Sequence, residues 1–153
     1  MPAREDPHKL VELMADNEEA LARLYRTYAQ RFPELADLWS ALAEDELTHA
    51  EWLRTFAGSI DAALHIDETR FRKEAVSSFG AYVREQTIRA QTQQLPPITA
   101  LSVARDAERA LIERRFFEVF ETDSVEMKHQ LQRLADSVEE HIRKVEQSWE
   151  EYR

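Results

Sequence analysis

The chain has 153 residues, and its 30 acidic residues against 20 basic residues give a formal net charge of -10. This length fits one domain with a hydrophobic core, and the acidic balance argues against binding to nucleic acid or to an anionic membrane surface. The chain contains no cysteine, which excludes disulfides, thiolate metal sites and dithiol redox chemistry. A bound metal ion would therefore need carboxylate and imidazole ligands.

No segment has the run of roughly 18 apolar residues that a membrane-spanning helix needs, and the amino terminus lacks the apolar core of a signal peptide. We therefore expect a soluble, cytoplasmic protein. Only two glycines are present, and Ala, Leu, Glu and Arg are abundant. That composition favours an all-α fold, which we expect to form a single domain over residues 1–153.

Two long helices are predicted in the first third of the chain. Asp6-Pro7 has the residue types of an N-cap and a first helical position, and apolar residues then recur every three, four or seven positions. Pro33 interrupts that helix, because the residue before a proline avoids the α region, and a second helix follows as far as Gly58. The short connection predicts an antiparallel hairpin over about residues 8–58.

A third helix of about residues 67–94 is predicted to connect the two halves of the chain. Residues 59–66 are predicted to be irregular, whereas Asp67 has the residue type of an N-cap. The apolar stripe that follows contains no acid, and Pro96-Pro97 prevents its continuation. We expect this segment to be a long crossover connection.

A second hairpin is predicted over about residues 98–152. Its first helix follows an apolar stripe that ends at Phe120, and its second follows a stripe that reaches Tyr152. Asp123 and Glu126, three residues apart, have the pattern of a capping box at the start of the last helix.

The two halves of the chain also echo each other weakly. The segment "LAEDELTH" (residues 42–49) resembles "LADSVEEH" (residues 134–141), and each lies in the second helix of its predicted hairpin. A hairpin, a crossover helix and a hairpin together make a four-helix bundle with one long connection, which is a common bundle topology.

Five polar side chains fall in the apolar stripes of the four long helices, at about the middle of each helix. They keep the spacing of their apolar neighbours, so they are predicted to point inward: Glu18, Glu46, His49, Glu108 and His141. Three unpaired buried carboxylates would offset most of the roughly 5–15 kcal/mol by which a domain is stable. Converging carboxylates and imidazoles therefore need a cation, and O and N ligands without sulfur suit iron, manganese or zinc.

These residues also have explanations that involve no metal. A single inward histidine is more often a core residue with its own hydrogen-bond partners than a ligand, which applies most to His141. Glu108 can instead pair with Arg105 or Arg115 reaching across the bundle. The five residues together make a stronger case for a metal than any one of them does alone.

The pattern resembles the ferritin-like superfamily, and within it the rubrerythrin-like proteins. Residues 18–53, "EEALARLYRTYAQRFPELADLWSALAEDELTHAEWL", are similar to the family's first hairpin, with a Glu, a Tyr seven residues later and then Glu-x-x-His. Residues 100–124, "ALSVARDAERALIERRFFEVFETDS", are similar to the start of its second hairpin, with Glu108 at the Glu position. The resemblance implies a ferritin-like four-helix bundle.

The resemblance also implies a ligand set. Glu18 and His49 correspond to terminal ligands of one metal ion, and Glu46 corresponds to a bridge between two ions. Glu108 and His141 correspond to ligands of the second ion. Iron is the implied metal, two ions per chain, with manganese and zinc as alternatives.

One departure from the family pattern leaves two functions open. Val138 lies three residues before His141, where the pattern has a second bridging Glu. The first function is a di-iron or di-manganese protein that reacts with O2 or peroxide, as a ferroxidase or a peroxide reductase. It would need an external electron donor, because the chain lacks a cysteine-rich, rubredoxin-type module. The second is a degenerate bundle that binds one metal ion or none and acts as a binding or scaffold protein. We expect a homodimer.

Overall fold

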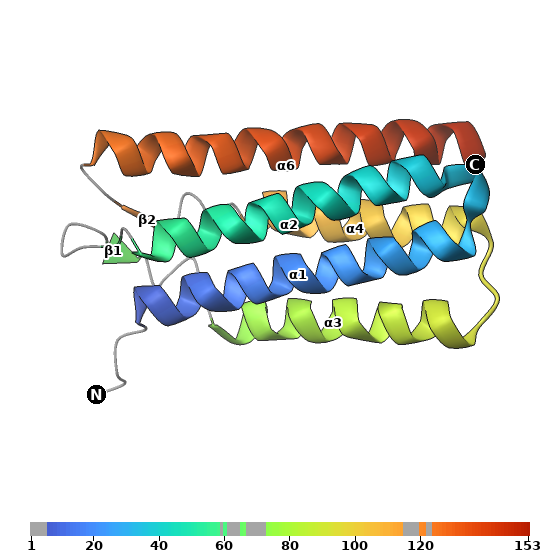
Figure 1. Cartoon of the computed structure of the whole chain (residues 1–153), viewed down its shortest axis with the longest axis horizontal. Coiled ribbons are helices and arrows are strands. Elements are labelled where there is room, and N and C mark those ends of the chain that lie inside the picture. Colours follow the sequence, from blue (N-terminus) through green and yellow to red (C-terminus); the bar gives the residue numbers. More distant parts are fainter. Residues whose placement is uncertain (1–5, 59, 61–64, 67–72, 115–119, 122–123) are drawn as a thin grey trace.

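The computed structural model describes residues 6–58, 60, 65–66, 73–114, 120–121 and 124–153, and these residues form a bundle of helices (Figure 1). The α-helices are α1 (Pro7–Arg31), α2 (Ala36–Gly58), α3 (Lys73–Thr92), α4 (Pro97–Arg114) and α6 (Val125–Tyr152). The all-α, ferritin-like bundle predicted from the sequence is confirmed. Within the described part of the chain, no helix is long and apolar enough to cross a membrane.

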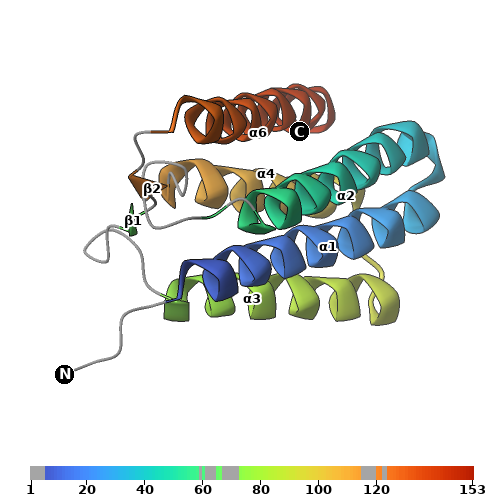
Figure 2. The same cartoon turned by 60° about the vertical axis from the view of Figure 1, so that its left-hand side comes forward.

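Successive helices run in opposite directions along the long axis of the bundle (Figure 1). The helices α1 and α2 form one antiparallel hairpin, and α4 and α6 form the other. Because α2 ends at the opposite end of the bundle from the start of α4, the chain must cross the whole length between the hairpins. The helix α3 makes this crossing and packs against α1 on the outside of the bundle (Figure 2).

The boundaries of the first hairpin follow from its capping residues. The carboxylate of Asp6 accepts a hydrogen bond from the backbone N–H of His8 at 3.0 Å, and Pro7 takes the first helical position. The helix ends at Arg31, before Pro33, as predicted. A short 3-10 turn, η1 (Pro33–Leu35), then leads into α2. Gly58 is the last residue of α2.

The fourth helix is shorter than predicted. It ends at Arg114, and Phe120 lies instead in β2 (Phe120–Glu121), which pairs antiparallel with β1 (His65–Ile66). Periodicity alone cannot distinguish a short apolar run in a strand from one in a helix, which explains the wrong prediction. The prediction of an irregular segment at 59–66 is likewise wrong for its last two residues.

The amino-terminal cap of α6 also differs from the prediction by one position. Ser124 is the N-cap, and its Oγ accepts a hydrogen bond from the backbone N–H of Met127 at 3.2 Å. Asp123, which the capping-box pattern favoured, lies outside the described residues, as does Asp67 at the predicted start of the third helix. Serine and aspartate are nearly equal as N-caps, so adjacent candidates are hard to separate from sequence.

A layer of polar side chains divides the hydrophobic core into two clusters. One cluster surrounds Tyr25 and Trp39, and the other surrounds Leu53 and Leu134. The helix α1 passes from one cluster to the other around Glu18, and α2 does so around Glu46 and His49. The polar layer therefore lies near the middle of the bundle, with apolar side chains on both sides.

The helix α3 contacts α1 beside this layer. The side-chain amide Nδ2 of Asn17 donates a hydrogen bond to the backbone carbonyl of Val76 at 2.9 Å. A Cβ atom on Gly80 would overlap with the Asn17 Oδ1 atom. Glycine at position 80 thus allows α3 to approach the residue that directly precedes Glu18.

We predict that Gly80→Ala lowers the free energy of unfolding by about 1 kcal/mol, although alanine favours a helix by about 1 kcal/mol over glycine. The added methyl displaces the Asn17 amide and breaks its buried hydrogen bond, which costs about 1–3 kcal/mol. In an Asn17→Ala background the same substitution should instead increase stability. Urea unfolding followed by circular dichroism measures both values, with Gly58→Ala as a control, because its Cβ would meet no atom within 4 Å. Equal effects in the two backgrounds would contradict the prediction.

Candidate metal centre

The structure brings all five inward residues predicted from the sequence into the polar layer. Every one of the four bundle helices contributes: α1 Glu18, α2 Glu46 and His49, α4 Glu108, and α6 His141. All five are buried, with relative exposures between 0% for Glu46 and 3% for Glu18. The three-and-four spacing of the apolar stripes was sufficient to find them, since a helix turns its stripe toward the core regardless of residue type.

Glu46 lies at the centre of the layer, between the two histidines. Its Oε1 atom is 3.0 Å from His141 Nδ1, and its Oε2 atom is 3.4 Å from His49 Nδ1. Glu18 Oε2 is 3.9 Å from His49 Nδ1, and Glu108 Oε1 is 3.8 Å from His141 Nδ1. The site therefore has two parts that share Glu46. We call Glu18 with His49 the first half-site, and Glu108 with His141 the second half-site.

The outward-facing nitrogens of both histidines are also held. His141 Nε2 lies 2.9 Å from Asp45 Oδ2, and His49 Nε2 lies 2.6 Å from Ser137 Oγ. Because an ionised carboxylate only accepts hydrogen bonds, Nε2 of His141 carries the hydrogen. Metal-binding histidines are commonly oriented in this way, by a hydrogen bond from the nitrogen that does not bind the metal. Both Nδ1 atoms consequently face Glu46.

Sequence reasoning missed Asp45 and Ser137, because neither lies on an apolar stripe. One signal was present in the echoed segments. Asp45 precedes His49 by four residues, and Ser137 precedes His141 by four residues, so each polar residue holds the same place relative to a histidine. Which histidine each contacts depends on the register between α2 and α6, which the sequence does not state.

Buried charges shift the protonation of this site. Burial raises the pKa of the Glu18 carboxyl well above its usual range, and the neighbouring Glu46 raises it further. Burial by itself would lower the pKa of both histidines, but the facing carboxylates outweigh it. They raise the pKa of His49 to about 10 and that of His141 to about 11. Without a cation, the layer therefore holds protons on its imidazoles at neutral pH.

The donor atoms fit a metal ion. Ligand atoms of Glu46, His49 and His141 lie within 4.8 Å of one another. Glu18 Oε2 and Glu108 Oε2 are buried and have no hydrogen-bond partner. An unpaired buried carboxylate oxygen is costly, and a cation between these helices would satisfy it. Oxygen and nitrogen donors suit iron, manganese and zinc.

Glu108 pairs with a tyrosine. The Tyr25 hydroxyl donates a hydrogen bond to Glu108 Oε1 at 2.8 Å, and both side chains are buried. Arg105, one alternative partner suggested by the sequence, has its guanidinium over the Trp149 ring at 4.0 Å from the centroid, and its Nε has no hydrogen-bond partner. The other alternative, Arg115, lies outside the described residues.

Val138 occupies the position where a second bridging carboxylate was expected. It is buried in α6, one turn before His141. Glu139 and Glu140 are exposed, so neither of these neighbours replaces the missing carboxylate in the polar layer. The second half-site is thus one carboxylate short, as the sequence indicates.

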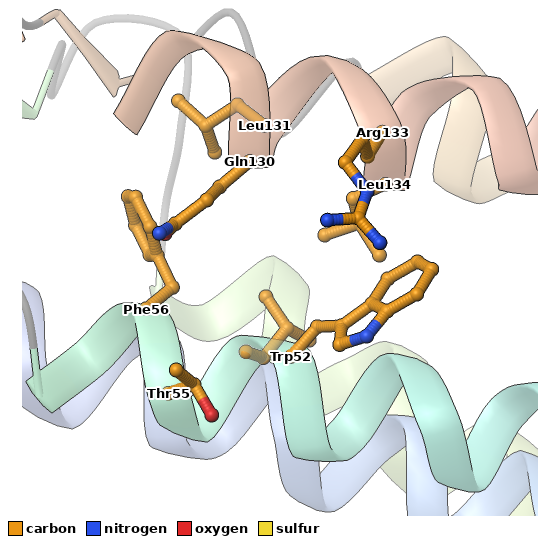
Figure 3. Close-up of a pocket in the computed structure, with 8 residues that line it drawn as sticks. Trp52, Thr55, Phe56, Gln130, Leu131, Arg133 and Leu134 are labelled. Atoms are coloured by element: carbon orange, nitrogen blue, oxygen red, sulfur yellow. The ribbon is translucent and has the colours of Figure 1, made fainter. Parts of the chain in front are cut away.

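A pocket of about 140 Å³ lies between α2 and α6, next to the first half-site (Figure 3). Figure 3 shows Trp52 and Arg133 facing each other at one end of it, and Phe56 and Gln130 at the other. The Arg133 guanidinium is 4.9 Å from the Trp52 ring centroid. The Trp52 ring also lies 5.7 Å from the His49 ring, between centroids. Trp52 therefore both lines the pocket and lies beside a residue of the polar layer.

Comparison with known proteins gives one family. A family model with the description Rubrerythrin matches residues 9–148, which include all five inward residues. Comparison with curated proteins and with solved structures gives no significant match. The family match covers both hairpins and the crossover helix, and so agrees with the fold and with the polar layer.

We predict that the metal-free protein loses stability as the pH rises above about 6.5. The folded pKa values of about 10 for His49 and about 11 for His141 exceed the unfolded value of about 6.5. Their contribution is fully present below pH 6.5 and is lost as the pH approaches the folded values, at up to about 1.4 kcal/mol per pH unit for each histidine. The raised pKa of Glu18 acts with the same sign.

Urea unfolding of chelator-treated protein between pH 6.5 and 9.5 measures this dependence. A variant with both His49→Gln and His141→Gln should show a much flatter profile over the same range. Stability of the unmodified chain that is constant or increases with pH would contradict the prediction.

Proposed function

Since this chain belongs to the rubrerythrin family, a ferritin-like di-iron carboxylate family, we propose that its polar layer binds two iron ions and reacts with O2 or peroxide. The observation that carries the proposal is the position of Glu46, which turns one carboxylate oxygen toward each histidine. A carboxylate in that position is suited to bridging two ions. Manganese or zinc would find the same donors.

The two half-sites define the role of each residue. Glu18 and His49 would hold one ion, Glu108 and His141 would hold the other, and Glu46 would contact both. Tyr25 holds the Glu108 carboxylate by its hydrogen bond. Asp45 and Ser137 fix the imidazole planes through their Nε2 atoms. These outer contacts keep the donor atoms in place before any ion arrives.

Two ferrous ions held by Glu18, Glu46, His49, Glu108 and His141 would supply the two electrons that, with two protons, reduce hydrogen peroxide to two water molecules. The apolar clusters on both sides of the layer exclude water from it, which limits side reactions. A donor that lies outside these 153 residues would return the electrons, because they contain no cysteine for a rubredoxin-type site.

The pocket beside Trp52 is the proposed route for the oxidant. Its lining is largely apolar, which suits a small molecule such as O2, and it includes Trp52, whose ring centroid lies 5.7 Å from that of His49. Leu134, one turn before Ser137, also lines the pocket.

Val138 favours a second candidate function. With one carboxylate fewer than the family pattern, the bundle would bind a single ion or none and act as a binding or scaffold protein. A single domain over residues 1–153, a homodimer and a cytoplasmic location stay predictions from the sequence.

We predict that anaerobic titration with ferrous iron saturates at two ions per chain. Aerobic addition should then oxidise that iron, with a rise in near-ultraviolet absorbance. Glu46→Ala should abolish both, because it removes the group shared by the half-sites, whereas Glu44→Ala, at an exposed site on the same helix, should change neither. Elemental analysis after loading gives the count. A value near zero would end the metal proposal, and a value of one would favour the second candidate.

We predict that Leu134→Phe slows aerobic iron oxidation several-fold while leaving the iron stoichiometry at two. The larger ring is expected to fill part of the pocket that Leu134 lines, and Leu134 is not one of the proposed ligands. Leu95→Phe is the matched control, because Leu95 lines a separate pocket with Arg31 and Phe32 at the other end of the bundle. Stopped-flow absorbance measures the rates. Equal rates in the two variants would show that the oxidant enters elsewhere.

A further inference from the structure

The second helices of the two hairpins hold each other's histidines. Asp45 of α2 contacts His141 of α6, and Ser137 of α6 contacts His49 of α2. In each helix the contacting residue lies four positions before the histidine of the same helix. The helices α2 and α6 run antiparallel (Figure 1), so the two contacts have the same spacing in opposite directions along the bundle. We call them the reciprocal contacts.

The reciprocal contacts differ in charge. Asp45 carries a carboxylate whose side chain is 44% exposed, whereas Ser137 carries a neutral hydroxyl. The next residue in each helix differs as well, since Glu46 of α2 corresponds to Val138 of α6 in the echoed segments. The helix α6 therefore has a neutral residue at both positions, one at the contact with the histidine and one in the polar layer. Both negative charges at these positions come from α2.

This asymmetry affects how well the carboxylates of the layer could balance the charge of two bound metal ions. Two divalent ions carry four positive charges, and the buried carboxylates of the layer are Glu18, Glu46 and Glu108. One negative charge is missing, at the position of Val138. An excess positive charge in an apolar interior is costly, so the ion with the weaker set of anions should be lost first. Among the side chains that the structure describes, Asp45 is the further carboxylate in direct contact with an inward side chain of the second half-site.

We propose that Asp45 supplies the negative charge that is missing at Val138, so that the second half-site holds its ion tightly only with Asp45 present. Asp45 acts through His141 as a positioning residue: its carboxylate accepts the Nε2 hydrogen, directs Nδ1 toward Glu46 and adds a negative charge to the second half-site. Ser137 orients His49 without adding charge, and the first half-site does not depend on Asp45. This inference rests on the proposed binding of two ions.

The test compares metal binding in four chains by anaerobic calorimetric titration with ferrous iron. Asp45→Asn keeps a hydrogen-bond acceptor and removes the charge, and Asp45→Ser reproduces the neutral contact residue of α6. Both should bind the first ion as the unmodified chain does and the second about 10–100-fold more weakly, a range typical for loss of an outer partner of a ligand. Glu44→Gln removes a charge from an exposed neighbour and should have no effect.

A spectroscopic measurement identifies the half-site that is lost. In zinc titrations followed by imidazole ¹⁵N resonances, one equivalent of zinc should shift His49 in the Asp45 variants, whereas His141 should need a large excess. In the unmodified chain both histidines should shift by two equivalents. If the substitution had only a structural effect, zinc binding would weaken at both histidines together. That result would overturn the inference.

A restoring substitution separates charge from geometry. Val138→Glu in the Asp45→Asn background should return the second ion to near the affinity of the unmodified chain, because it puts the missing carboxylate back into the layer. Two tightly bound ions in Asp45→Asn and Asp45→Ser would overturn the inference and leave the proposed function intact. Fewer than two ions in the unmodified chain would overturn the proposed function itself.

Discussion

Three carboxylates and two imidazoles in an apolar interior are the constraint on which the rest of this structure depends. Each group is nearly or fully buried, and Glu46 lies within 3.4 Å of both imidazoles. Such a layer is stable only if the charges compensate one another, by protons on the histidines or by cations. The two apolar clusters lie on either side of this layer, and all four bundle helices contribute to it.

The groups that compensate one another lie on different hairpins. Glu46 and His141 link α2 to α6, and Tyr25 and Glu108 link α1 to α4. Each pair connects one hairpin to the other, so the same polar groups that fit a metal also hold the bundle together. The pocket between α2 and α6 lies beside these links, where the packing of the two helices leaves space. Binding of a cation in this layer would therefore be coupled to association of the hairpins.

Sequence periodicity was enough to place the helices and all five inward residues, because a stripe of regular spacing fixes which side of a helix is buried. It failed where the answer depends on contacts between elements. The strands β1 and β2 are too short to have a sequence pattern of their own. The sequence predicted Asp123 as the N-cap of α6, whereas the N-cap is the adjacent Ser124. Asp45 and Ser137 lie on helix flanks, and their roles follow from the register between α2 and α6. The pocket is a property of packing that no local pattern encodes.

The crossover by α3 has a consequence for the order in which the protein is made. Glu46 and His141 are 95 residues apart in the chain, and Tyr25 and Glu108 are 83 apart. During synthesis the first hairpin emerges with Glu18, Glu46 and His49, while the partners of these residues have yet to be translated. Contacts between residues so distant in sequence form late in folding, after local helices and hairpins. The second half-site is thus completed only when α6 docks, and a cation that binds both halves draws the folding equilibrium toward the finished bundle.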